Sequence, residues 1–120
     1  MPSTSPTTRA DFLRGVPARP RCGFATYLED GFAVDHWVCE VWDAERGHWV
    51  LEDADKQRHD VPRDEFLTGA DAWQRCREDP TFTERIGYDA KTRGLRVARA
   101  NLVRDMAAQA LWLGARERAA

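Results

Sequence analysis

Residues 33–53 read AVDHWVCEVWDAERGHWVLED, and this stretch decides the fold. The run from Ala33 to Trp42 is rich in Val and Trp, which favours a β-strand, and a second strand is expected from Gly47 to Asp53. Between them, Asp43–Gly47 has the polar, glycine-ended composition of a hairpin turn. The two strands are therefore expected to pair in an antiparallel sheet.

One more strand is expected before this hairpin, from Ala18 to Tyr27. The tripeptide Glu29-Asp30-Gly31 turns the chain between this strand and the next. Because Pro20 has no amide hydrogen to donate to a sheet, the first strand either lies at an edge or starts late. Together the three strands predict an antiparallel meander.

Two helices are expected after the strands. The first runs from Arg63 to the Asp79-Pro80 step, which ends it, because apolar residues recur there at helical spacing. These residues are Phe66, Leu67, Ala70, Trp73 and Cys76. The second starts at about Leu95, with one apolar stripe formed by Ala98, Leu102, Met106 and Ala110. A sheet followed by helices predicts the α+β class, with an antiparallel β-sheet flanked by helices.

The chain of 120 residues is long enough for one domain and too short for two cores. Residues 1–8 read as a disordered tail because Ser, Thr and Pro prevail there, and residues 9–115 form the expected domain. A short helix is expected at the start of this domain, with Thr8 as its N-cap. It ends at Gly15, since Pro17 bars its continuation.

Charge and cysteine content exclude several classes of function. The net charge is −2 and the arginines alternate with acids, so we expect a solvated charged surface and no nucleic-acid partner. No apolar stretch is long enough to cross a bilayer, and residues 1–8 lack the apolar core of a secretory signal, so no membrane partner is expected. Three cysteines, an odd number, argue against a disulfide framework and for a reducing, cytoplasmic location.

The hairpin predicts that a histidine and an aspartate meet. If Trp42 and Gly47 close a four-residue loop, His36 lies directly opposite Asp53 and both side chains point to the same face. The same register sets Val38 against Leu51 and Glu40 against Trp49. A carboxylate beside an imidazole fixes its tautomer and stabilises its protonated form, which is the base half of a catalytic triad. A structural hydrogen bond is the alternative interpretation of the pair.

Several segments carry a resemblance to a known family. They are Gly15-Val16-Pro17-Ala18-Arg19, Gly23-Phe24, Asp35-His36-Trp37-Val38-Cys39-Glu40, Trp49-Val50-Leu51-Glu52-Asp53, Val61-Pro62-Arg63-Asp64-Glu65-Phe66, Ala72-Trp73-Gln74-Arg75-Cys76-Arg77 and Asn101-Leu102-Val103-Arg104-Asp105-Met106-Ala107-Ala108. In order and spacing they resemble the transglutaminase-like superfamily, in a bacterial branch that reads D-H-W-V. The resemblance covers residues 11–108 and implies a shortened transglutaminase-like, papain-like core.

By this resemblance, His36 is the general base and Asp53 is the carboxylate that orients it. The implied activity is acyl transfer or amide hydrolysis through a thioester, on a peptide, amide or small-molecule acyl substrate and without a cofactor. The superfamily's nucleophilic cysteine lies at the start of a helix before the Gly15 turn, where the helix dipole lowers its pKa. Residues 1–8 contain no cysteine, so the usual nucleophile position is missing.

Three explanations of the missing nucleophile stay open. Cys22, on the strand before His36, is either a displaced nucleophile or a buried structural cysteine. His36 is also able to move protons without a thiol, as a general acid or base. The third explanation is a non-catalytic binding protein on the same fold, or an incomplete version of a longer chain.

Other expectations concern the surroundings of His36. Trp37 and Trp49 are candidate substrate-binding residues, because tryptophans cluster on the hairpin and could wall a substrate channel. No metal is expected, since His36, Asp53 and the cysteines lack the spacing of a zinc site. A shortened nucleophile helix would uncover apolar sheet surface, so we expect a homodimer or a partner chain that covers the sheet.

Overall fold

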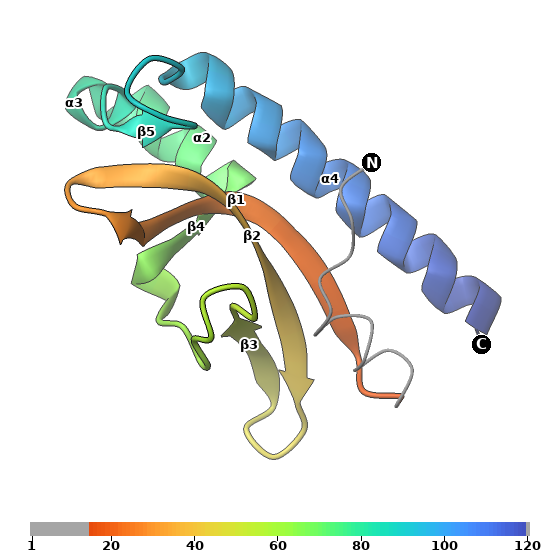
Figure 1. Ribbon diagram of the computed structural model, residues 1–120. Coiled ribbons are helices and arrows are strands. Elements are labelled where there is room, and N and C mark those ends of the chain that lie inside the picture. Colours follow the sequence, from red (N-terminus) through yellow and green to blue (C-terminus); the bar gives the residue numbers. More distant parts are fainter. Residues whose placement is uncertain (1–14, 120) are drawn as a thin grey trace.

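A computed structural model describes residues 15–119, and their side chains as far as residue 115. Within these residues the class is α+β, as expected: a five-stranded sheet with three helices (Figure 1). The tail of residues 1–8 and the short helix from Thr8 lie outside the described residues, apart from Gly15 at the end of that helix, so both stay predictions.

The elements follow one another with short connections. The strands are β1 (Ala18–Glu29), β2 (Phe32–Asp43), β3 (His48–Glu52), β4 (Phe66–Thr68) and β5 (Ile86–Gly87). The helices are α2 (Gly69–Glu78), α3 (Pro80–Thr83) and α4 (Leu95–Ala119), and a 3-10 turn, η1 (Arg63–Glu65), precedes β4. None of these helices is long and apolar enough to span a membrane.

The sheet has the order β3-β2-β1-β4 and is antiparallel along this path. β5 lies beside the start of β2 and runs parallel to it. A bulge between Ala25 and Glu29 shifts the register of β1 against β2, so that Gly23 stands opposite His36. The bulge therefore decides which residues of β1 lie next to His36.

The β2–β3 hairpin closes one residue later on each strand than expected. The closing pair is Asp43 and His48, in place of Trp42 and Gly47. Gly47 lies inside the loop with a φ of 70°, a conformation that glycine adopts without strain. The Asp43 carboxylate also accepts a hydrogen bond from the Arg46 amide, so the chemistry of the turn makes Asp43 the last strand residue.

The expected register was therefore wrong: Glu40 pairs with Leu51 instead of Trp49. Each β2 residue faces a residue two places further along the chain than predicted. Side chains on a strand alternate with a period of two, so this shift leaves every residue on its expected face. Asp53 consequently stays on the side of His36, although it is not directly opposite.

Two apolar clusters fill the two sides of the sheet. α2 and α4 cover one face, where Phe24 and Ile86 are fully buried among helix residues (Figure 1). The other face carries Val38, Leu51 and Phe66, which pack with a buried valine from the loop after β3. His36 belongs to this second face, because it lies two residues before Val38 on β2.

The first predicted helix begins later than expected. Residues 63–65 form η1, Phe66–Thr68 pair with β1 as β4, and α2 starts only at Gly69, with Thr68 as its N-cap. Pairing with a distant strand outweighs the helical spacing of these residues. The predicted end at Asp79-Pro80 is confirmed. The polar stretch that follows also holds α3 and β5, which were too short to predict.

α4 starts at Leu95, as predicted, but it buries a different stripe. Its buried residues are Val97, Ala98, Asn101, Asp105 and Ala108, whereas Met106 and Ala110 are exposed. The two polar members are buried because they bond to β1 and β2. The Asn101 amide donates to the Gly23 carbonyl and to the Asp35 carboxylate, and Asp105 accepts from the Cys22 amide. Apolar spacing alone could not identify this side.

Candidate functional site

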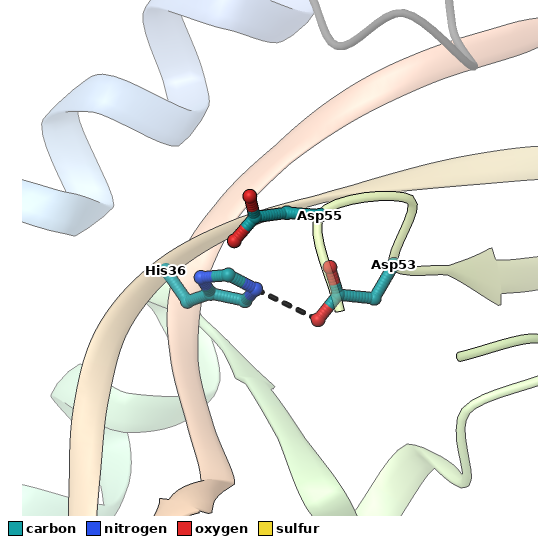
Figure 2. Close-up of side chains that lie close together, drawn as sticks. All are labelled: His36, Asp53 and Asp55. Carbon is teal, nitrogen blue, oxygen red and sulfur yellow. Dashed lines mark hydrogen bonds and ion pairs between the residues drawn. The ribbon is translucent and has the colours of Figure 1, made fainter. Parts of the chain in front are cut away.

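The pair expected at the hairpin is present. His36 Nε2 lies 2.8 Å from Asp53 Oδ2, and Asp53 comes directly after β3 (Figure 2). The backbone groups of Asp53 and Arg58 bond to each other across the turn that follows β3. This bridge fixes the backbone from which the Asp53 carboxylate reaches the imidazole.

Asp53 is buried, and both of its carboxylate oxygens are bonded. Oδ2 accepts hydrogen bonds from the Tyr27 hydroxyl at 2.6 Å and from His36, and Oδ1 accepts one from the Lys56 amide at 3.1 Å. Burial alone would raise the pKa of Asp53, but the bonds from Tyr27 and His36 outweigh it and lower that pKa. Asp53 is therefore ionised at neutral pH.

The ionised carboxylate decides the tautomer of His36. It has no proton to donate, so the hydrogen in the bond to Oδ2 comes from His36 Nε2. In the neutral ring the lone pair then lies on Nδ1, which makes no hydrogen bond to any residue that the structure describes. The side chain is 12% exposed, so solvent reaches it. This arrangement suits a general base, because Nδ1 takes the proton and Asp53 stabilises the imidazolium.

Tyr27 is a member of this site that the sequence did not reveal. Its ring meets the His36 ring edge-on, with 6.3 Å between the centroids. Burial and the neighbouring Asp53 carboxylate raise the pKa of the Tyr27 hydroxyl, which therefore stays protonated and donates. Arg58 lies 4.2 Å from the centre of the Tyr27 ring and pairs with Glu65 at 3.1 Å. Only the register of β1 and β2 shows that Tyr27 faces His36.

Cys22, the candidate nucleophile, does not meet His36. It stands opposite Trp37, one residue out of step with His36, so strand alternation sends its side chain to the other face of the sheet. It is fully buried there, and burial together with Asp35 and Asp105 raises the pKa of its thiol to about 12. A displaced nucleophile at this position is incompatible with the geometry.

The remaining two cysteines are no better placed. Cys39 follows Trp37 by two residues on β2 and shares its face, where the thiol is buried. Cys76 lies in α2, and burial raises the pKa of its thiol. All three cysteines of the chain are free thiols, and none lies on the His36 face.

The two tryptophans expected to bind substrate lie away from the pair. Trp37 follows His36 on β2 and therefore points to the opposite face. Trp49 shares the face of His36, but its strand partner is Trp42, six residues and roughly 20 Å further along β2. The rings of Trp42 and Trp49 pack edge-on with 5.5 Å between centroids. Tyr27 takes the place beside His36 that was expected for a tryptophan.

A cation could in principle use the same residues. His36, Asp53 and Asp55 offer one nitrogen and two carboxylate oxygens within 4.8 Å of one another (Figure 2). Asp53 already accepts three hydrogen bonds, however, and the His36 nitrogen that faces it carries a proton. Asp55 is exposed and pairs with Lys56 at 3.6 Å. These residues fit a hydrogen-bonded pair better than a metal centre, and the absence of a metal stays a prediction.

A second polar cluster surrounds Glu40, which is buried on the same face. Its carboxylate accepts hydrogen bonds from Arg19, Arg21 and Arg63 at 2.7 to 2.8 Å, and Arg21 also binds both oxygens of Asp105 in α4. Burial alone would raise the pKa of Glu40, but these arginines lower it. The solvated surface expected for the arginines was wrong for Arg19 and Arg21, because a buried carboxylate requires partners.

The position of every side chain in the site thus follows from the sheet register and the turn after β3. In comparisons with known proteins, no family model, no curated protein and no solved structure matches this chain.

Proposed function

We propose that this chain is a transglutaminase-like protein in which His36, held by Asp53, works as a general base on an acyl substrate. The bond from His36 Nε2 to Asp53, which leaves Nδ1 as a proton acceptor, is the observation that carries the proposal. The order of the motifs along the chain supports the family, and the α+β fold is compatible with it.

Because no cysteine of the chain reaches His36, we propose water as the nucleophile. The reaction is then hydrolysis of a peptide, amide or small-molecule acyl group. As the water oxygen bonds to the carbonyl carbon, a water proton passes to His36 Nδ1. When the bond to the leaving nitrogen or oxygen breaks, His36 returns that proton to the leaving atom. No cofactor takes part, and the three free thiols suit a reducing compartment such as the cytoplasm.

The test measures hydrolysis of a p-nitrophenyl ester of a short acyl group from about pH 5 to about pH 8, the range in which a histidine titrates. His36→Ala and Asp53→Asn should each lower kcat/KM by about 100-fold, since one removes the base and the other the carboxylate that fixes its tautomer. Cys22→Ala should leave kcat/KM unchanged, because its side chain lies on the other face.

His59 provides a matched control for this experiment. It pairs with Glu52 at 2.8 Å, as His36 pairs with Asp53, but its side chain is 83% exposed. His59→Ala therefore measures the slow hydrolysis that any solvated imidazole supports. If His36→Ala, shown to be folded by circular dichroism, loses no more activity than His59→Ala, the proposal is wrong.

A second candidate is a non-catalytic binding protein on the same fold. It is favoured by the three hydrogen bonds on Asp53, which tie β1, β2 and the turn after β3 together and would stabilise the fold without any reaction. In this case His36→Ala lowers the free energy of unfolding, whereas the wild type hydrolyses no ester faster than His36→Ala does.

A further inference from the structure

Exposed apolar side chains gather on one side of α4. Four large ones lie between positions 103 and 113 of α4 and are more than half exposed: Val103 (58%), Met106 (63%), Leu111 (55%) and Leu113 (55%). Elsewhere in the described residues, the exposed apolar side chains of this size are Val16 and Leu95, at 36% and 40%. Single exposed apolar side chains are normal on a protein surface, but four of them on one helix form a patch.

The exposed residues form a continuous stripe. At about 100° per residue, the positions on it span roughly 160° of the helix circumference and contain no polar side chain. We name it the α4 stripe; its members are Val103, Met106, Ala107, Ala110, Leu111, Leu113 and Gly114. The residues buried against the sheet, among them Asn101, Asp105 and Ala108, lie on the opposite side of the helix. α4 thus presents an apolar side away from its own sheet.

A surface helix normally carries charged or polar residues on the side away from the core. The start of α4 follows this rule, with Arg96 and Arg99 exposed there. From Val103 to Leu113 the outward side is apolar, which is the pattern of a helix that is covered on both sides. Among the residues that the structure describes, the exposed large apolar side chains therefore gather on α4, and the partner expected on the sheet stays a prediction.

We propose that the α4 stripe packs against the α4 stripe of a second copy of this chain, with the two helices antiparallel. When a surface binds the same surface of a second copy, two-fold symmetry relates the two chains, and each contact occurs twice. Centred near Ala108, the antiparallel pair sets Met106 against Ala110 and Val103 against Leu113, so that the longest side chain meets a small one and the two branched side chains meet each other. The small side chains at the centre allow the two backbones to approach closely.

Charge selects the antiparallel arrangement. Arg96 and Arg99 are exposed near the start of α4, within two turns of Val103. In a parallel pair the arginines of the two copies would face one another and repel. In the antiparallel pair they lie apart, each near the C-terminal end of the other helix, where the helix dipole is negative.

The size of the stripe indicates a reversible dimer. Four large side chains that are more than half exposed offer on the order of 400 Å², which is the size of the largest apolar patch on a typical monomer, and such patches are often functional. With Ala107 and Ala110 included, two copies would bury close to the lower limit of about 1,000 Å² for a specific interface. The proposal does not depend on the acyl chemistry at His36, which lies on β2.

The experiment is sedimentation equilibrium of the full chain at concentrations up to about 1 mM, where even weak association is populated. We expect a monomer–dimer equilibrium. Met106→Glu with Leu113→Glu should weaken dimerisation by about tenfold or more, since two charges would have to lose their water in the interface. Val16→Glu is the control, because it adds a charge at an exposed apolar position outside α4.

Oxidative cross-linking tests the orientation. In the antiparallel pair, Ala107→Cys stands near its own copy, whereas the two copies of Leu113→Cys lie about 15 Å apart along the axis. The first variant should form a covalent dimer and the second should not. A wild type that stays monomeric, a dimer unaffected by the double charge change, or an efficient cross-link at position 113 would each overturn the proposal. Ester hydrolysis by the charge variants, measured alongside, reports on His36 separately.

Discussion

Cys22 and His36 lie on neighbouring strands but one residue out of step, because Gly23 stands opposite His36. On paired strands this single residue sends the two side chains to opposite faces of the sheet. The thiol points toward α4, and the imidazole points toward Tyr27 and Asp53. No rotation of either side chain joins them, so a thiolate–imidazolium pair between Cys22 and His36 would require a new register.

The three cysteines are therefore expected to react slowly with iodoacetamide. Cys22 is fully buried with a pKa of about 12, so almost none of it is thiolate at neutral pH. Residue-resolved alkylation followed by mass spectrometry checks this in the wild type and in His36→Ala. We expect the two proteins to give the same Cys22 rate. A Cys22 that reacts fast at about pH 6 and slows without His36 would contradict the structure.

Tyr27→Phe should lower the free energy of unfolding by about 1 to 2 kcal/mol, because it removes a hydrogen bond to an ionised, buried carboxylate. It should also raise the pKa of Asp53, which loses one of the donors that lower it. Urea unfolding and carboxyl NMR titration measure the two effects. The control is Tyr88→Phe, whose hydroxyl bonds to Arg104 on the surface and should matter less. Equal losses for both variants would show that the bond to Asp53 adds little.

Stability should fall in acid, through Glu40 and Asp53. The folded state lowers the pKa of both groups, so their stabilisation is present above their ordinary pKa values, about 4, and is lost as the pH falls through the lowered folded values. Glu40→Gln should be about 3 to 5 kcal/mol less stable at neutral pH, since it removes the buried carboxylate shared by three arginines and leaves Arg21 with Asp105 alone, and should show a shallower acid loss. Urea unfolding at neutral and acid pH measures both.

The control for Glu40→Gln is Glu65→Gln. Glu65 pairs with Arg58 at 3.1 Å with about a third of each side chain exposed, so its removal should cost less than about 1 kcal/mol. A Glu40 variant as stable as the Glu65 variant would mean that the arginine cluster is solvated.

Gly23→Ala should destabilise the chain by about 2 to 3 kcal/mol or more. A methyl group there would lie 2.0 Å from the Leu67 carbonyl oxygen, so β4 would have to separate from β1. Urea unfolding measures the loss. Gly31→Ala is the comparison: its methyl group meets nothing within 4 Å, and only a φ of 70° opposes it, at about 1 kcal/mol. A Gly23 variant no weaker than the Gly31 variant would contradict the β1–β4 contact.

The sequence predicted the α+β class and the contact between His36 and Asp53, even though its hairpin register was wrong. Both depend on short-range rules: a strand alternates with a period of two, and a turn needs Asp and Gly at set places. An error of two positions in the register does not change the face of a residue. The pair was therefore predictable from residues 33–53 alone.

The tertiary structure alone decided the rest of the site. The bulge in β1 sets Gly23 rather than Ala25 opposite His36, and β4 replaces the start of an expected helix because it pairs with β1. The buried side of α4 contains Asn101, a polar residue that only its bonds to Gly23 and Asp35 allow to be buried. Each of these outcomes depends on partners far away in the chain, and a local pattern contains no information about such partners.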